Sequence, residues 1–348
     1  MPLTAEYHAL GAIGARLINT ASIFKPMGRE LSIPPPPSLD EMRAYLAPNR
    51  SLLEEGRPWI TNGLRANVRD GVEITEEEYF GVAEQVSQLA KTLEFALEVA
   101  IADRNWQEAV KWSVHLFDLS NGMHRGAMTD DIIATESHLF CGVKILSNSR
   151  RSIPPEIIAT SLVKELLRID GERDTWDVQL ARRAAWEERV GLRSNPPDWD
   201  ALISPFNFPT ADEWHEYVVT ITSHWNSPPE QRYAWTIQRK VQQRTLLRML
   251  IVDLIVRLYR DMHGSYPESF AEFMPAPFRE TALCDPCTGK DFHYRRTRDE
   301  FVLYSPGITQ IDHGGQFGNL EDVFEGRADL CLDAWGYAQS CQTERAVP

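Results

Sequence analysis

The chain has 348 residues, of which 43% are hydrophobic and 25% are charged, and its formal net charge is −14. This length and hydrophobic content supply core material for two domains, which excludes a chain that is disordered throughout. The acidic balance excludes the dense basic face on which nucleic-acid binding depends, so we predict no nucleic-acid partner.

The two most apolar windows, 8–24 and 246–258, both carry charged residues. Arg16 interrupts the first window, and Arg248 and Asp253 lie in the second. Neither window supplies the roughly 20 uninterrupted apolar residues that cross a bilayer. The first residues also lack the basic region and the small-residue cleavage site of a signal peptide. We therefore predict no membrane span in this chain, and its compartment stays open.

Residues 1–74 are expected to be irregular, apart from a helix around 7–24. Four consecutive prolines, Pro34 to Pro37, favour an extended polyproline conformation. We interpret this run as a stiff spacer.

Residues 75–228 are expected to form a helical domain. Thr75 followed by Glu78 is typical of a capping box, and the sequence then predicts an amphipathic helix to about Ala102. Its apolar stripe consists of Val82, Val86, Leu89, Leu93 and Leu97. A second helix after Asn105 completes a hairpin similar to one tetratricopeptide unit, but no 34-residue repeat follows, so we predict an irregular bundle. Further helices are expected at 130–147, 155–169, 174–189 and 210–225, with a proline-rich loop at 195–209.

A long helix is predicted for residues 230–263, because one face carries an apolar stripe along much of its length. The stripe consists of Leu246, Leu247, Leu250, Ile251, Leu254, Ile255 and Leu258. Two aromatic-rich runs, 292–296 and 300–304, predict a β-hairpin with Arg295, Arg296 and Arg298 on its solvent side. Residues 326–348 form a tail without strong periodicity. The predicted fold class is mainly α, with a small α+β part at the C-terminus.

Four motifs follow the long helix in a fixed order. They are His263-Gly264-Ser265-Tyr266-Pro267-Glu268-Ser269-Phe270, Asp285-Pro286-Cys287-Thr288-Gly289-Lys290, Leu303-Tyr304-Ser305-Pro306-Gly307 and Asp312-His313-Gly314-Gly315. This order resembles the major pseudopilin of type II secretion and, more closely, the C-terminal module of a set of uncharacterised bacterial proteins. The resemblance is best over 230–316. It implies a pseudopilin-like module over 229–325, in which the long helix packs against a small antiparallel sheet, and it implies a cell-envelope location.

The same resemblance raises the question of calcium, because major pseudopilins hold this ion in the loop after the second strand. Thr309 stands where the family has an aspartate, and the weak candidates left are Asp312, Glu321 and Asp322. Calcium takes six to eight oxygen ligands, so three carboxylates are too few for tight binding. The alternative is a solvated acidic loop.

Four of the five cysteines, Cys284, Cys287, Cys331 and Cys341, lie in the C-terminal part of the chain. The spacing is unlike that of compact zinc modules, and a Cys-x-x-Cys in a turn is not the usual redox site at a helix start. We interpret these cysteines as thiols or disulfides. Cys141 lies in an apolar helical stretch and is expected to be a buried thiol.

No catalytic constellation stands out. The segment that begins at His215 resembles a zinc-protease helix but has Val219 where the second histidine must be, and neither a nucleophile elbow nor a phosphate loop occurs. Six tryptophans lie between Trp176 and Trp235 among acidic residues, a composition that a glycan-cleaving cleft uses but that packed helices also show. Our leading hypothesis is a non-catalytic cell-envelope or assembly protein with protein partners. The alternatives are a glycan hydrolase with its site in this tryptophan-rich region, and a soluble helical adaptor.

Overall fold

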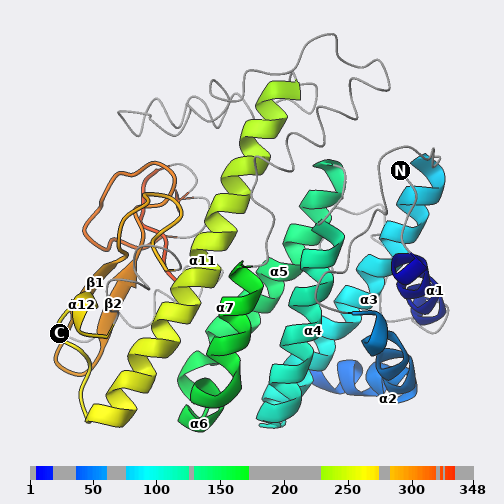
Figure 1. Ribbon diagram of the computed structural model, residues 1–348, viewed down its shortest axis with the longest axis horizontal. Coiled ribbons are helices and arrows are strands. Elements are labelled where there is room, and N and C mark those ends of the chain that lie inside the picture. Colours follow the sequence, from blue (N-terminus) through cyan, green and yellow to red (C-terminus); the bar gives the residue numbers. More distant parts are fainter. Residues whose placement is uncertain are drawn as a thin grey trace. The chain divides into compact units, whose positions relative to one another are not determined.

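The computed structural model describes residues 5–18, 37–60, 76–124, 129–171, 229–273, 283–318, 322–323 and 326–333 (Figure 1). This part of the chain is mainly helical, with a small two-stranded antiparallel sheet near the C-terminus, and the predicted fold class is thereby confirmed. No helix in these ranges is long and apolar enough to cross a membrane. The helices expected at 174–189 and 210–225 lie outside the described residues.

Two compact units divide these residues, with the division between Ile145 and Leu146. The N-terminal unit contains α1 (Ala5–Ile18), α2 (Leu39–Gly56), η1 (Arg57–Trp59), α3 (Glu76–Ala102), α4 (Trp106–His124) and most of α5 (Thr129–Ser149). The C-terminal unit contains η2 (Arg150–Ser152), α6 (Pro155–Ile157), the π-helical η3 (Ile158–Leu162), α7 (Val163–Gly171), α11 (Pro229–His263), α12 (Phe270–Phe273), β1 (His293–Arg296) and β2 (Phe301–Tyr304).

Helix α3 is the centre of the N-terminal unit, since α1, α2 and α4 all pack against it. Four residues of the predicted stripe are buried, since Val86, Leu89, Leu93 and Leu97 are each at most 1% exposed, whereas Val82 is half-buried. The approach of α1 is unusually close, because a Cβ atom on Gly14 would lie 1.9 Å from the carbonyl oxygen of Gln85. Only glycine fits at this crossing.

Helix α2 lies in the segment that we expected to be irregular, and this expectation was wrong. Ser38 caps the helix: its hydroxyl accepts from the backbone N–H of Glu41, whose carboxylate accepts from the Ser38 N–H at 2.8 Å. This reciprocal box satisfies two backbone donors at the helix start. Met42 and Tyr45 then pack against Phe95 of α3, which fixes α2 on the central helix.

Helix α11 organises the C-terminal unit and is continuous, as predicted. Figure 1 shows α7 on one side of it and the β1–β2 hairpin on the other, and both make contact with it. Leu247, Leu250, Ile251 and Leu254 are fully buried, whereas Ile255 is half-buried. The neighbouring Leu246, Met249, Val252 and Val256 are also buried, so this stretch is covered all round rather than along one stripe.

The charges within this buried stretch are paired. Asp253 accepts hydrogen bonds from the Nε atoms of Arg257 at 2.7 Å and Arg150 at 3.2 Å. Arg248 donates from Nε to Asp170 at 2.9 Å. Because an unpaired buried charge is costly, these pairs explain how an apolar helix tolerates the charges that interrupt its stripe.

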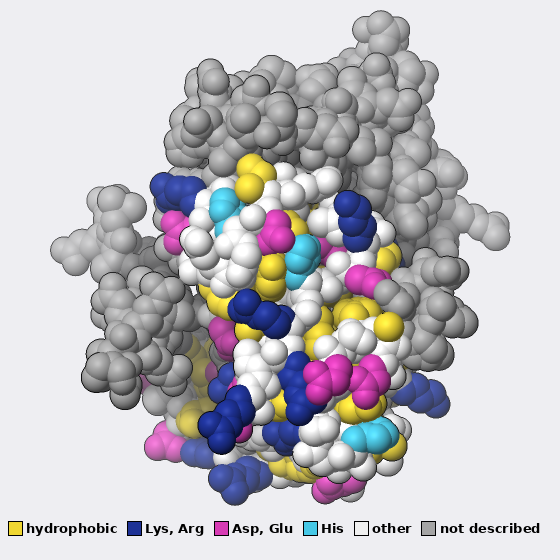
Figure 2. Space-filling view, turned by 90° about the vertical axis from the view of Figure 1, so that its left-hand side faces the viewer, with side chains coloured by type: hydrophobic (Ala, Val, Ile, Leu, Met, Phe, Trp, Pro, Cys, Tyr) yellow, Lys and Arg dark blue, Asp and Glu magenta, His cyan; other side chains and the backbone are white. Residues whose placement is uncertain are grey.

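The hairpin pairs His293 with Tyr304 and Arg296 with Phe301 in an antiparallel register. Its inner aromatic rings pack edge to face, for example Phe301 against Tyr266 with ring centroids 5.1 Å apart. Basic side chains gather over the lower part of the face shown in Figure 2. The prediction that the arginines share one solvent face is only partly right: Arg295 and Arg298 are exposed, whereas Arg296 is half-buried, lies on the opposite face of β1 from Arg295 and pairs with Glu268.

Candidate functional site

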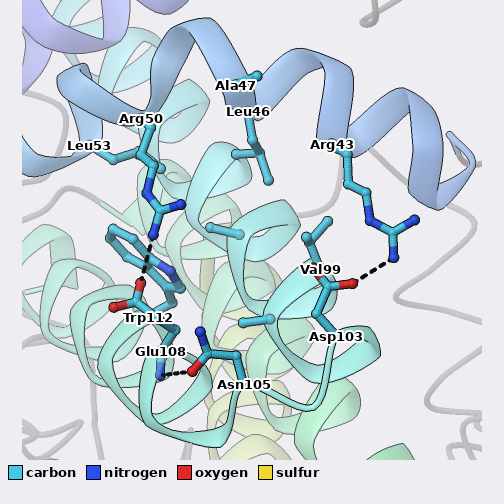
Figure 3. A pocket seen from close by; sticks show the side chains of 12 residues that line it. Arg43, Leu46, Ala47, Arg50, Leu53, Val99, Asp103, Asn105, Glu108 and Trp112 are labelled. Atoms are coloured by element: carbon cyan, nitrogen blue, oxygen red, sulfur yellow. Dashed lines mark hydrogen bonds and ion pairs between the residues drawn. The ribbon is translucent and has the colours of Figure 1, made fainter.

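A groove of about 290 Å³ lies in the N-terminal unit, between α2 and the α3–α4 hairpin (Figure 3). It is lined by Arg43, Leu46, Ala47, Arg50, Leu53, Ala96, Val99, Ala100, Asp103, Asn105, Glu108 and Trp112. The aliphatic residues and the tryptophan form an apolar surface, and the arginine, acidic and asparagine side chains surround it. Combining a mostly apolar surface with a few polar groups is typical of a binding site.

Two ion pairs connect α2 to the α3–α4 hairpin along the groove. Arg43 donates to Asp103 at 2.6 Å, which links α2 to the end of α3, and Arg50 lies 3.7 Å from Glu108 of α4 (Figure 3). The hydrogen bonds to Asp103 and then Asp40 raise the pKa of Arg43 above its ordinary value. These pairs are exposed, so they position the helices more than they stabilise them.

The turn between α3 and α4 sets how these two helices line the groove. Arg104 adopts a positive φ of 54°, and the Asn105 side chain accepts from the backbone N–H of Glu108 at 3.3 Å, which caps α4. Trp112 follows two turns later and is 4% exposed, with the Lys111 ammonium 4.2 Å from its ring centroid. The same ammonium donates to Glu54 of α2 at 2.7 Å, so α2 and α4 are joined beside the tryptophan.

His115 lies beneath this end of the groove, with its ring centroid 5.8 Å from that of Trp112. Burial, followed by the nearby positive charges of Arg57 and Lys111, lowers its pKa from 6.5 to about 4. The ring is therefore neutral at physiological pH, and its buried Nδ1 atom has no hydrogen-bond partner. Because burial disfavours the protonated ring, protonation of His115 at low pH should destabilise this region.

Asp285, in the second motif after the long helix, has a structural role. Its fully buried carboxylate accepts from Ser305 Oγ at 2.8 Å, Thr288 Oγ1 at 3.0 Å and the Cys287 N–H at 2.9 Å, and it contacts Thr245 of α11 at 3.4 Å. Burial raises the pKa of Asp285 above its ordinary value. The motif thus joins α11, the turn before β1 and the residue that follows β2.

The calcium candidates have other partners. Asp312 accepts from the Tyr304 hydroxyl at 3.1 Å and the Gly314 N–H at 2.8 Å, and Asp322 pairs with Arg327 at 3.1 Å. Glu321 lies outside the described residues. Within the ranges that the structure describes, no three His, Cys, Asp or Glu side chains gather as a metal site would require.

The structure describes four of the five cysteines. Cys284, Cys287 and Cys331 are thiols, with the Cys284 sulfur 3.4 Å from the Arg248 guanidinium, while Cys341 lies outside the described residues. Cys141 is a half-buried thiol whose pKa burial raises to about 11. The tryptophan-rich region of the hydrolase alternative also falls outside, because 172–228 is not described and Trp235 lies on a turn of α11 whose side chains are not described.

Comparison of the chain with protein-family models, curated proteins and solved structures gave no match. The groove is therefore the feature of this chain that bears on its function. Sequence reasoning missed it because the groove needs α2, and the signal that could have found α2 is the spacing of Ser38 and Glu41.

Proposed function

We propose that this protein is an assembly or interaction protein of the bacterial cell envelope, and that its N-terminal unit binds a short segment of a partner protein in the α2–α3–α4 groove. The observation that carries the proposal is the apolar groove floor surrounded by charged side chains. Its volume of about 290 Å³ is near the lower limit for ligand pockets, so it suits one or two side chains rather than a large cofactor.

The chemistry of the rim suggests what kind of segment binds. Arg50 has a side chain that is 69% exposed, and its 3.7 Å contact with Glu108 is longer than a charge-assisted hydrogen bond. Its guanidinium can therefore receive a carboxylate from a ligand. Leu46 and Val99, which are half-buried, offer an apolar surface beside it. The expected ligand is a peptide with a large apolar residue next to Asp or Glu.

The envelope part of the proposal rests on the C-terminal unit. The sequence motifs resemble those of pseudopilins, and Asp285, Ser305 and the turn glycine Gly289, with φ of 68°, join α11 to the hairpin. Because these motif residues hold the fold together, they support a structural role for this unit rather than an active site. The apolar residues in the middle of α11 are buried within this packing.

A peptide selection tests the proposal. Purified protein is used to select from a displayed random peptide library, and a selected peptide is then titrated against three proteins. Ala47→Arg places a long side chain in the groove from an exposed position of α2, and Ala44→Arg adds the same side chain at an exposed position of α2 that does not line the groove. We expect Ala47→Arg to weaken binding at least tenfold and Ala44→Arg to leave it unchanged. Selection of no peptide, or equal binding by both variants, would contradict the proposal.

A further inference from the structure

Three polar side chains form a hydrogen-bonded line between α3 and α5, in the N-terminal unit but apart from the groove-lining residues. The hydroxyl of Ser87 lies 2.7 Å from Nε2 of His138, and Nδ1 of His138 lies 2.7 Å from the Glu94 carboxylate. Both distances are within the range of good hydrogen bonds. The order is that of a nucleophile, a base and an orienting acid.

The chemistry of the groups fixes the direction of the protons. Glu94 accepts from the Lys91 ammonium at 2.6 Å and, as a carboxylate, has no proton to give to His138. Nδ1 of His138 must therefore donate to Glu94. In the neutral ring Nε2 is then unprotonated and accepts the hydroxyl proton of Ser87, which is the arrangement that activates a serine.

The three residues differ in burial, and an activated serine must be the most exposed of them. Glu94 is 2% exposed and His138 is 8% exposed, whereas Ser87 is half-buried, so Ser87 is the most exposed residue of the three. Lys91 is one helical turn from Ser87 on the same face of α3, and its ammonium is held by Glu94 at 2.6 Å. The neighbouring Cys141 is no rival nucleophile, because burial raises its pKa to about 11.

We propose that Ser87 is a nucleophile activated by His138, and that it reacts with small neutral carboxylic esters. The Ser87 oxygen attacks the ester carbonyl while its proton moves to Nε2 of His138. The bond to the alcohol oxygen then breaks, and the alcohol leaves with that proton, which leaves an acyl group on Ser87. Water, with His138 as base, hydrolyses the acyl-serine to a carboxylic acid and restores the hydroxyl. Glu94 is a positioning residue.

The size and charge of the substrate follow from the surroundings. A half-buried hydroxyl on the side of a helix admits only a small acyl group. Lys91 and Glu94 already pair with each other at 2.6 Å, so the site presents no net charge to an ionic substrate. Among the described residues, Glu98, Cys141 and Lys144 also interact electrostatically with this cluster. This activity would be independent of peptide binding, because none of these residues lines the groove.

The test uses an alkyl fluorophosphonate, which transfers its phosphorus to an activated serine with loss of fluoride, together with p-nitrophenyl acetate. We expect one adduct on the full chain, mapped to Ser87 by peptide mass spectrometry and absent from urea-denatured protein. Ser87→Ala should abolish both the adduct and acetate release, and His138→Gln should slow both by about 10²–10⁴-fold. Ser51→Ala, at an exposed serine of α2, should change neither rate.

Two further measurements separate loss of reactivity from loss of folding. Circular dichroism shows whether each variant is folded, and if His138→Gln is not, Glu94→Gln and Glu94→Asp replace it. Loss of the carboxylate that orients His138 should slow labelling in Glu94→Gln, and Glu94→Asp, which keeps a carboxylate, should recover part of the rate. No adduct, an adduct on another residue, or a rate unchanged by both variants would overturn the proposal. Ala47→Arg should leave labelling intact, which separates this site from the groove.

Discussion

The half-buried His115, whose ring lies beside that of Trp112, should make the N-terminal unit sensitive to mild acid. His115 has a pKa of about 4 in the folded protein, against an ordinary value of 6.5. As pH falls from 6.5 to 4, the unfolded chain binds a proton at this residue and the folded chain does not. The free energy of unfolding must therefore decrease over this window, and below about pH 4 this contribution is complete.

The size of the effect follows from the shift. One pKa unit corresponds to about 1.4 kcal/mol, so a shift from 6.5 to about 4 amounts to about 3 kcal/mol of stability between neutral pH and pH 4. His115→Leu removes the titrating ring and the unpaired Nδ1 atom. We expect the variant to be at least as stable as the wild type at pH 7 and to lose less stability on acidification.

The assay is urea unfolding monitored by tryptophan fluorescence at several pH values from 7 to 4, for the wild type and His115→Leu. Comparing the two proteins cancels the titration of the carboxyl groups that they share. The difference between their free energies of unfolding should grow by about 3 kcal/mol as pH falls to 4. His8→Leu, at an exposed position of α1, is the control for replacing a histidine by leucine. A difference that stays constant with pH would refute the reasoning.

Four further predictions concern packing and the C-terminal unit. Leu254→Ala, at a fully buried position of α11, should cost about 2–5 kcal/mol in urea unfolding, and a cost below about 1 kcal/mol would contradict the packing described. Gly14→Ala should release α1 from α3, seen as faster amide exchange in α1, because the added methyl meets a backbone oxygen. Asp285→Ala should lower stability by leaving the Ser305 hydroxyl and its neighbours unpaired, and an unchanged thermal midpoint would argue against its structural role. Thermal melts with calcium and with a chelator should coincide, whereas a rise of several degrees with calcium would show a complete site.

Elements with a strong local pattern could be predicted from the sequence. The spacing of Val86, Leu89, Leu93 and Leu97 predicted α3, and the same argument predicted α11 as one helix. The hairpin followed from its two aromatic runs. In each case the periodicity of the apolar residues matches the repeat of a single element, so no knowledge of tertiary contacts was needed.

Features that depend on distant contacts could not be predicted. Helix α2 was missed because it follows a proline run and carries Pro48 in its interior, two signals that normally argue against a helix, and the groove was missed with it. The line from Ser87 to His138 joins residues 51 positions apart, and it depends on how α3 and α5 are rotated against each other. Nor does any pattern show that His115 is desolvated, because its pKa depends on burial and on Arg57.

The most direct test of the interaction proposal is a map of where a selected peptide binds. Amide and indole signals of isotope-labelled protein are followed by NMR during titration with the peptide. We predict that the largest shifts belong to Ala47, Val99, Ala100 and the Trp112 indole, which line the groove, and that the signals of α1 are unaffected. Shifts that avoid these residues, or that cluster on another surface, would contradict the proposal that this groove binds the partner.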